Sequence, residues 1–516
     1  MCATVAMRPR EPSLEVQQVC SQIFNHSPLK ADRTKFTYWT MNDYGKKIDK
    51  LLFCKPQEGF SSHYFENMSE IAAIEGFEIV PSATVHACRD PKMRVSDGVI
   101  IEPTWHDNVY VAIGRFEKRA KYLKNHAAYL TKHPSFSDIH VGAVALQRLH
   151  RCSPEGVANE NRRESRLYFE GGDGFHLTNA HGSQQYIFGD DLSCINHQLL
   201  RKNKWFSDVN PESDNIKTEA FVFAKYNDGI TLPYVSKLIA KKIENETKAI
   251  REKLSDENAL NTLKEMDQMG LLTSLKFNEE KDKIKGRHLA AEYLAELQFV
   301  KERLFPCELR CESINVIFSP QLAYHLDLAM MPGPKGSIFL ADHEESVRLL
   351  ESIHAKAKEL GFDKKTIDHL SSFIQTTKQV ARDLKPLFNE TKKRYESAGH
   401  PVISTPAAFY SYVDGKPFNV NFLNCVTGYS EKTGHFYVIA PGTQTEGILG
   451  DVLMDCYVEF IKSHCNDVAV YFAGRNPKHE RDFTEAVTIM NEETQQIGPH
   501  CLSFELKVSP HTTQIT

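Results

Sequence analysis

Short apolar and β-branched runs, each bounded by glycine, proline or polar residues, recur along most of this 516-residue chain. Runs of this length indicate short buried strands. In the first part of the chain they predict strands at 50–55, 77–81, 95–101 and 109–116 and helices at 64–74 and 118–131. The local order is strand, turn, strand, helix.

The same order recurs further along, although no repeat is visible in the letters. Later strands are predicted at 167–173, 186–188, 314–318, 337–340, 419–427, 436–440, 468–472 and 501–508, with a helix at 450–464. Strands that alternate with helices in this β-β-α-β rhythm are typical of an α/β fold.

Two charged stretches break the rhythm, and both have helical spacing. In the first, Ser255-Asp256-Glu257 is typical of a helix start. In the second, apolar residues from Val347 to Leu360 share one helix face, and the helix is expected to break near Gly361 and Pro386. We interpret both as helical insertions whose charges lie on solvated faces, in preference to a dedicated partner site.

These patterns divide the chain into six parts. Expected are an N-terminal extension (1–45), a first part of the α/β body (46–233), a helical insertion (234–304), a further part of the body (305–344), a second helical insertion (345–400) and a C-terminal part of the body (401–516).

The composition excludes several classes of protein. A hydrophobic share of 41% and a charged share of 25% are typical of a globular protein. The net charge of −5 provides no electrostatic footprint for nucleic acid. No signal-peptide h-region and no membrane-spanning apolar run is visible, so the expected location is cytoplasmic, with secretion by a route without a cleavable signal as the alternative.

The 12 cysteines are scattered, which indicates reduced thiols rather than a disulfide framework. Cys307 and Cys311 form a lone C-x3-C pair, which is weak evidence for zinc without a second pair. We therefore expect no metal and no cofactor.

Four polar clusters lie where predicted strands meet turns. In chain order they are Asp97, Glu170 with Gly171-Gly172-Asp173, His325 with Asp327, and His500-Cys501. His325 and Asp327, two residues apart on an extended strand, would project to the same face and put a proton carrier beside a carboxylate. Each cluster alone is ordinary, since Asp-Gly is usually a turn and a single Cys is usually a small core residue.

Together and in this order, the clusters resemble the pentein (guanidino-group-modifying) superfamily, which includes arginine deiminase, dimethylarginine dimethylaminohydrolase, agmatine deiminase and the amidinotransferases. The similarity is carried by RVSDGVIIEP with AIGRF, LYFEGGDGF, YHLDLAMMPGPKGSIFL, VNFLNCVTGYSEKTGHFYVIAPG and GPHCLSFEL. It covers a little over half of the chain and is absent from residues 1–45 and from both helical insertions.

The resemblance implies a fivefold pseudosymmetric α/β propeller of β-β-α-β units with helical insertions, and an active site on the central axis. It also implies roles for six residues. Cys501 would be the nucleophile, His325 the proton carrier and Glu170 the group that orients it. Asp97 and Asp327 would clamp a guanidinium through bidentate hydrogen bonds, and Asp173 would support the substrate-binding loop.

This sequence departs from the superfamily pattern at the nucleophile. Gln496 and Ile497 precede Gly498-Pro499-His500, where the superfamily commonly has several glycines. The first insertion lies between Glu170 and His325, where it could cover the channel mouth or dock a protein. Arg475 and Asn424 lie near the motif stretches, and for both we favour a structural role over contact with a substrate.

The favoured hypothesis is a hydrolase of the deiminase or dimethylaminohydrolase type that acts on arginine, an arginine derivative or protein arginine. The alternatives are an amidinotransferase that moves the amidino group to an amine, and a propeller without catalysis that binds proteins through its helical insertions. A papain-like peptidase is excluded by order, because its nucleophile precedes the histidine, whereas Cys501 follows His325.

Overall fold

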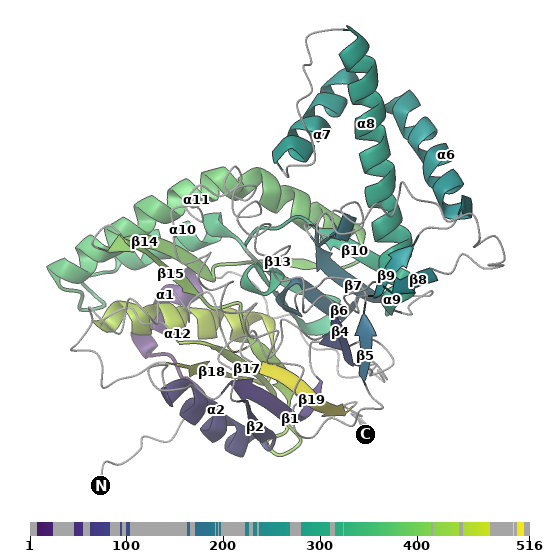
Figure 1. Cartoon of the computed structure of the whole chain (residues 1–516). Coiled ribbons are helices and arrows are strands. Elements are labelled where there is room, and N and C mark those ends of the chain that lie inside the picture. The colour runs from purple at the N-terminus through teal and green to yellow at the C-terminus, as the bar shows by residue number, and fades with distance from the viewer. Residues whose placement is uncertain are drawn as a thin grey trace.

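The computed structural model shows small sheets and helices that pack around a common interior (Figure 1). It describes residues 8–23, 46–54, 62–82, 93–94, 100–103, 162–165, 171–190, 192–193, 196–197, 222–225, 231–234, 237–268, 280–309, 315–323, 325–413, 416–442, 447–474, 499 and 503–509. No helix among these residues is both long and apolar enough to cross a bilayer.

Five three-stranded sheets of the described chain share one pairing pattern. In each, the middle strand pairs antiparallel with one neighbour and parallel with the other. With the middle strand named second, the sheets are β19 (Ser503–Ser509), β1 (Lys47–Cys54) and β2 (Glu78–Ser82); β3 (Met93–Arg94), β4 (Ile100–Pro103) and β5 (Arg162–Ser165); β6 (Gly174–Thr178), β7 (Gln184–Gly189) and β10 (Asn315–Ser319); β11 (Met330–Pro332), β12 (Ile338–Ala341) and β13 (Val402–Thr405); and β16 (Val426–Tyr429), β17 (Phe436–Pro441) and β18 (Val468–Ala473).

A parallel pair needs a long crossover, and in four of these sheets the crossover contains helices. The helices are α2 (Ser62–Glu75) between β1 and β2; α6 (Lys237–Lys253), α7 (Asp256–Gln268), α8 (Glu280–Phe299) and α9 (Phe305–Leu309) between β7 and β10; α10 (His343–Ala355) and α11 (Lys364–Ser397) between β12 and β13; and α12 (Gly447–His464) between β17 and β18. The predicted α/β class is therefore confirmed.

The first sheet joins the two ends of the chain, because β19 pairs with β1. Among the described residues, two short hairpins lie outside the five sheets: β8 (Val222–Lys225) with β9 (Thr231–Tyr234), and β14 (Ala408–Val413) with β15 (Lys416–Asn421). The predicted strand at 109–116 and helix at 118–131 lie outside the described residues.

The predicted strand at 419–427 is wrong in its extent. β15 ends at Asn421 and β16 begins at Val426. Between them the Asn421 side chain accepts a hydrogen bond from the Leu423 amide at 2.8 Å, and the Cys425 amide donates to the Leu423 carbonyl at 2.7 Å. This local turn divides the apolar run into two strands.

The main hydrophobic core lies between the sheets and helices α10, α11 and α12. Leu350, Phe373 and Leu453, one from each helix, are fully buried in it. The N-terminal helix α1 (Leu14–Ile23) lies against α12, and just before it Arg10 forms ion pairs with Asp451 and Asp455. Part of the predicted N-terminal extension is thus a packed helix.

Helix α11 runs through Pro386 without ending, so the predicted break there is wrong. Proline removes one helical hydrogen bond and crowds the preceding turn. Here Leu384 before the proline and Tyr395 after it are both buried in the main core, and these contacts hold the helix on both sides. The break expected near Gly361 is confirmed, since this residue lies between α10 and α11 with a φ of +73°.

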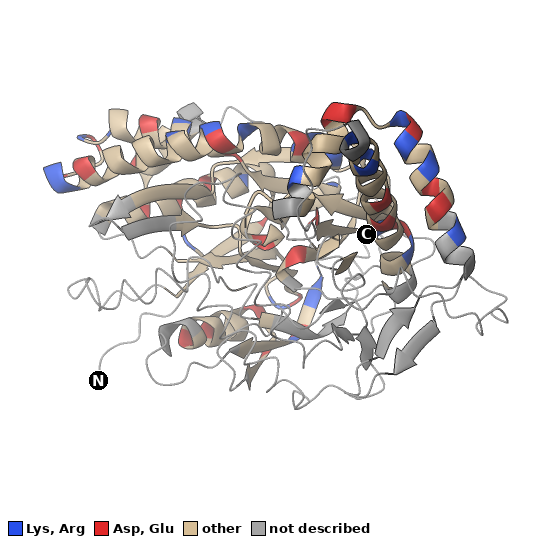
Figure 2. Ribbon diagram, turned by 45° about the horizontal axis from the view of Figure 1, so that its top comes forward, with Lys and Arg blue, Asp and Glu red and all other residues tan. Residues whose placement is uncertain are grey.

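Helices α6, α7 and α8 form an arm that stands away from the sheets (Figure 1). A small apolar cluster holds α7 to α8 and includes Leu263, Met266 and Tyr293. As expected, α7 begins directly after Ser255, whose hydroxyl accepts from the Asn258 amide at 3.2 Å. Lys and Arg mix with Asp and Glu along the outer helices, whereas the strands between them are mostly uncharged (Figure 2).

Candidate active site

The glycine-rich turn before β6 touches the His325 segment directly. Gly171–Asp173 forms one 3-10 turn that leads into β6 at Gly174, so the predicted strand at 167–173 is wrong over these three residues, while 167–170 lie outside the described residues. A Cβ atom on Gly172 would lie 2.7 Å from His325 Nδ1 and 2.9 Å from Asp327 Oδ2. Only glycine fits between these two side chains. The structure thus brings together two of the predicted clusters.

Asp173 forms the buried part of this contact. Its side chain has no exposed surface. One carboxylate oxygen, Oδ1, accepts from the Gln321 side-chain amide at 2.7 Å and from the Leu326 backbone amide at 3.0 Å. A carboxylate with two such donors fixes the residues that carry them. Asp173 therefore holds the backbone one residue after His325.

His325 and Asp327 do not lie together on an extended strand, contrary to the expectation from their spacing. His325 is extended, with φ −117° and ψ 155°, and directly precedes a 3-10 turn, Leu326–Leu328. The turn forms because the Leu326 amide bonds Asp173, the Leu328 amide bonds the His325 carbonyl and the Ala329 amide bonds the Leu326 carbonyl. The side chains of His325 and Asp327 nevertheless lie close to the same point, because both approach Gly172.

Gln321 is a site residue that the sequence did not single out. It is 7% exposed, and its amide donates to Asp173. A Cβ atom on Gly189, at the end of β7, would lie 2.6 Å from its Nε2 atom. Nothing in the local sequence distinguishes this glutamine, because its role depends on a residue far away along the chain.

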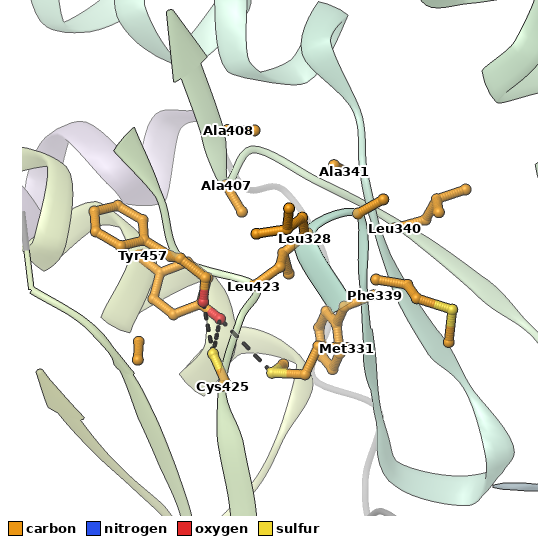
Figure 3. Packing of buried hydrophobic residues seen from close by; sticks show 14 of the residues in the cluster. Leu328, Met331, Phe339, Leu340, Ala341, Ala407, Ala408, Leu423, Cys425 and Tyr457 are labelled. Atoms are coloured by element: carbon orange, nitrogen blue, oxygen red, sulfur yellow. Dashed lines mark hydrogen bonds between the residues drawn. The ribbon is translucent and has the colours of Figure 1, made fainter. Parts of the chain in front are cut away.

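Asn424 and Cys425 occupy an equivalent place in another sheet. They directly precede β16, the first strand of its hairpin, just as Asp173 precedes β6 and the His325 turn precedes β11. Asn424 is fully buried. The Cys425 thiol donates to the Phe422 carbonyl at 2.6 Å and lies 3.7 Å from the Tyr457 hydroxyl, which itself lies 3.7 Å from Met331 Sδ (Figure 3).

The environment of Cys425 keeps its thiol neutral. Burial raises the pKa of Cys425, and the nearby Asp327 carboxylate raises it further, while the Tyr457 hydrogen bond opposes this. A neutral, buried thiol is a poor nucleophile. The signal that could have identified Cys425 is its position directly before the first strand of a hairpin, and this signal is visible only when the hairpins are aligned with one another.

Three predicted site residues lie outside the described part of the chain: Asp97, Glu170 and Cys501. Their neighbours along the chain are described. Asp97 falls between β3 and β4, Glu170 directly precedes the Gly171 turn, and Cys501 precedes β19 by two residues. Arg475 also lies outside the described part, as does Cys311 of the C-x3-C pair. In the described part, no group of three or more His, Cys, Asp or Glu side chains could hold a metal ion.

The arrangement can carry a proton and hold a cation. His325 and Asp327 are 5% and 1% exposed, so the electrostatic attraction between a bound cation and this carboxylate would be weakly screened. The imidazole beside it has ring nitrogens that can donate or accept a proton. These are requirements for chemistry on a planar, positively charged group.

No family model matches the chain, and no curated protein matches it in sequence. Solved structures that resemble it include a Porphyromonas gingivalis protein assigned as an arginine deiminase, with 11% identity and a TM-score of 0.37 over 91% of this chain and 98% of that one. Agmatine deiminase of C. jejuni matches with 10% identity and a TM-score of 0.34 over 90% of this chain and 94% of that one. A cysteine-to-serine variant of that enzyme with bound substrate has the same identity and TM-score, over 91% of this chain and 98% of that one.

Proposed function

We propose that this protein is a guanidine-modifying hydrolase, of the deiminase or dimethylaminohydrolase type, that acts on arginine or an arginine derivative through Cys501. The observation that carries the proposal is the contact at Gly172, where an added Cβ atom would lie within 3 Å of both His325 and Asp327. These clusters lie far apart in the sequence and were selected from sequence alone. Their meeting supports a common site.

The substrate class follows from the carboxylates. A guanidinium is planar and cationic, and its carbon is a poor electrophile because the charge is delocalised. Carboxylates in its plane form paired, charge-assisted hydrogen bonds that fix its orientation. Asp327, buried beside His325, is suited to be one such clamp, and Asp97 is assigned as the other.

The reaction proceeds in two steps. The Cys501 thiolate adds to the guanidinium carbon, and His325 gives its proton to the departing amine, which leaves a thiouronium on Cys501. His325 then takes a proton from a water molecule that adds to the same carbon. The carbon–sulfur bond breaks and the added hydroxyl group loses its remaining proton to solvent, which releases a ureido product and restores the thiolate. Glu170 orients His325 and stabilises its charged form.

The finer architecture belongs to the same proposal. Five sheets with one pairing pattern are suited to a fivefold propeller, and the pairing of β19 with β1 is suited to its closure. Glu170, His325 and Cys501 would then meet near the axis, because each lies shortly before the strand that pairs antiparallel with the middle strand of its sheet. Asn424 and Cys425, which directly precede β16, would line the channel at the corresponding position of their own sheet.

The choice of Cys501 over Cys425 rests on charge. Cys425 lies beside Asp327, and both its burial and that carboxylate raise its pKa, so it is not the thiolate. We expect 2-chloroacetamidine, a cationic alkylating agent, to label Cys501 and to leave Cys425 unlabelled. Peptide mass spectrometry measures this directly.

The test of function offers free arginine, agmatine, methylated arginine and an arginine peptide, with and without an added amine, and assays ureido product. Wild type should turn over at least one of them, and Cys501→Ser should lose at least about 1,000-fold in kcat. Cys465→Ala, which removes a buried thiol at the end of α12, is the matched control and should keep its activity. A wild type silent on every substrate, or an active Cys501→Ser, overturns the proposal. Transfer of the amidino group to the added amine, detected as a new guanidine without ureido product, identifies an amidinotransferase instead.

Variants of Asp173 distinguish a role in supporting the loop from a role in binding the substrate. Asn keeps an oxygen that can accept from Gln321 and Leu326, but it has no charge. If Asp173 acts through these two hydrogen bonds, Asp173→Asn should keep kcat/KM within about threefold, whereas Asp173→Ala should lose about 100-fold. Equal losses in both variants would instead assign Asp173 to the binding of the cation.

A further inference from the structure

The loop that carries His325 and Asp327 is held at both ends by one side chain of α11. The Tyr395 hydroxyl donates to Ser319 Oγ at 2.7 Å, and it lies 3.2 Å from Met330 Sδ. Ser319 is the last residue of β10, and Met330 is the first residue of β11. His325 and Asp327 lie on the segment between these two residues, 320–329. One hydroxyl therefore bridges the two ends of the candidate catalytic loop.

The hydrogen bonds around this hydroxyl have a defined direction. Ser319 donates its own proton to the Pro320 carbonyl at 3.1 Å, so its oxygen is free to accept from Tyr395. Burial, the largest cause, raises the pKa of Tyr395, and the nearby Asp173 carboxylate raises it further. The phenol therefore remains a proton donor throughout the ordinary pH range.

The residue before Tyr395 holds the same strand end. Arg394 donates to the Phe318 carbonyl at 2.6 Å and to Asp190 Oδ2 at 3.1 Å. Asp190 directly follows β7, the strand that pairs with β10. The last turn of α11 thus fixes the end of β10 through neighbouring side chains, one to its backbone and one to its last hydroxyl.

Inside the loop the support continues to the turn itself. Gln321, two residues after Ser319, donates to Asp173, and Asp173 accepts the Leu326 amide. From the far side, the Asn421 amide donates to the Leu328 carbonyl at 2.7 Å. The outermost group in this sequence of contacts is Tyr395, which is fully buried in the main core.

We propose that Tyr395 is a positioning residue for His325 and Asp327, which it serves by clasping the two ends of segment 320–329. The proposal rests on the proposed function, and it assigns to α11 a part in catalysis. A displacement of about 1 Å in a catalytic group can cost about 100-fold in rate. Loss of the clasp loosens the loop without removing any group that meets the substrate, so it lowers kcat more than it changes KM.

The decisive variant is Tyr395→Phe, which removes one oxygen atom and keeps the ring in the core. Its matched control is Tyr410→Phe, another buried tyrosine of the same core, whose hydroxyl lies 3.2 Å from His343 Nε2. We expect Tyr395→Phe to lower kcat about tenfold on free arginine or agmatine, with KM within about twofold of wild type. Tyr410→Phe should keep both constants.

A second variant tests the same contact if Tyr395→Phe fails to fold. Ser319→Ala removes the acceptor from the other side, and the double variant should lose little more than Tyr395→Phe alone, because Ser319→Ala breaks one of the two contacts that Tyr395→Phe already removes. Additive losses would show that the two groups act separately and would overturn the clasp.

Amide hydrogen exchange gives a readout that does not need a substrate. The Leu326 amide is bonded to Asp173, so its protection reports the order of the loop. Exchange in segment 320–329 should accelerate in Tyr395→Phe and not in Tyr410→Phe. Unchanged exchange, or an equal loss of kcat in both variants, overturns the proposal. If wild type is inactive on every guanidine, the proposed function fails, and the exchange experiment alone still decides whether Tyr395 holds the loop.

Discussion

The two helical insertions look alike in sequence, but they are built differently. Both are rich in charged residues with apolar positions at helical spacing. Helices α10 and α11 bury residues such as Leu350 and Phe373 in the main core, whereas α7 and α8 share a small cluster around Leu263 and stand away from the sheets (Figure 1). A long charged helix can therefore be an integral part of the body, and side chains of α11 even contact the end of β10, directly before the candidate catalytic loop.

Several contacts attach the base of the arm to the body. Glu296, near the end of α8, accepts from the His197 ring at 2.7 Å, and both side chains are almost completely buried. Beyond α8, Lys301 forms an ion pair with Asp190. Lys301 belongs to a π-helical turn, Val300–Leu304, that joins the arm to α9. Local unfolding of the outer arm would leave these contacts in place, and this difference can be tested.

Core truncation should give the largest contrast. Phe373→Ala in α11 should lower the free energy of unfolding of the whole protein by about 3–5 kcal/mol, because it leaves a cavity in the main core. Leu263→Ala in α7 should cost about 2–3 kcal/mol within the arm alone. Urea unfolding measures the first effect, and hydrogen exchange in α7 measures the second. Global destabilisation by Leu263→Ala would show that arm and body unfold as one unit.

Acid stability should distinguish the two regions next. Burial lowers the pKa of His343, at the start of α10, from 6.5 to about 4. The unfolded chain therefore binds a proton that the folded protein excludes, so stability is complete above pH 6.5 and is lost as the pH falls towards 4. Between pH 7.5 and pH 5, wild type should lose about 2 kcal/mol more than His343→Gln in the free energy of unfolding. Parallel losses in both proteins would mean that α10 does not unfold with the body.

The fold class could be predicted from the chain because short apolar runs and their turns are local signals. The strands around Leu51, Val438 and Val470, and the helix start at Ser255, depend on neighbours along the chain. What failed depended on distant residues. The break at Pro386 was expected from one residue, but core contacts on both sides of it override the local preference.

The site shows the same limit. His325, Asp327 and the Gly172 turn could be selected because their residue types and order resemble a known set of motifs. Their turn geometry could not, since it is set by the Asp173 carboxylate, which comes from far away in sequence. Gln321 and Tyr395 carry no local signal at all, and only the structure places them behind the loop.

Helix caps should give a smaller, matched contrast. At α10, Asp342 accepts from the Glu344 and Glu345 amides at 3.0 and 3.3 Å, while at α7 Ser255 accepts from the Asn258 amide. Asp342→Ala should lower the free energy of global unfolding by about 1 kcal/mol. Ser255→Ala should destabilise α7 by about 0.5 kcal/mol and so lower the helicity of the arm, without an effect on global unfolding. Urea midpoints and far-UV circular dichroism separate the two. Asp342→Asn, which can still cap, serves as the conservative control and should remain near wild type.

The smallest effect is expected where arm and body meet. Lys301 pairs with Asp190 and lies 5.2 Å from the centre of the Phe318 ring, with both charged side chains about one-third exposed or less. Such pairs contribute little, so Lys301→Met should lower the free energy of unfolding by about 0.5 kcal/mol. The control is Lys248→Met on α6, which removes an exposed pair with Glu244 inside the arm and should have no measurable global effect. Asp190 also binds Arg394, which holds the strand end before the catalytic loop. If Lys301→Met accelerated hydrogen exchange in segment 320–329 while Lys248→Met did not, the arm and the candidate active site would be coupled, and the arm could no longer be regarded as an independent part.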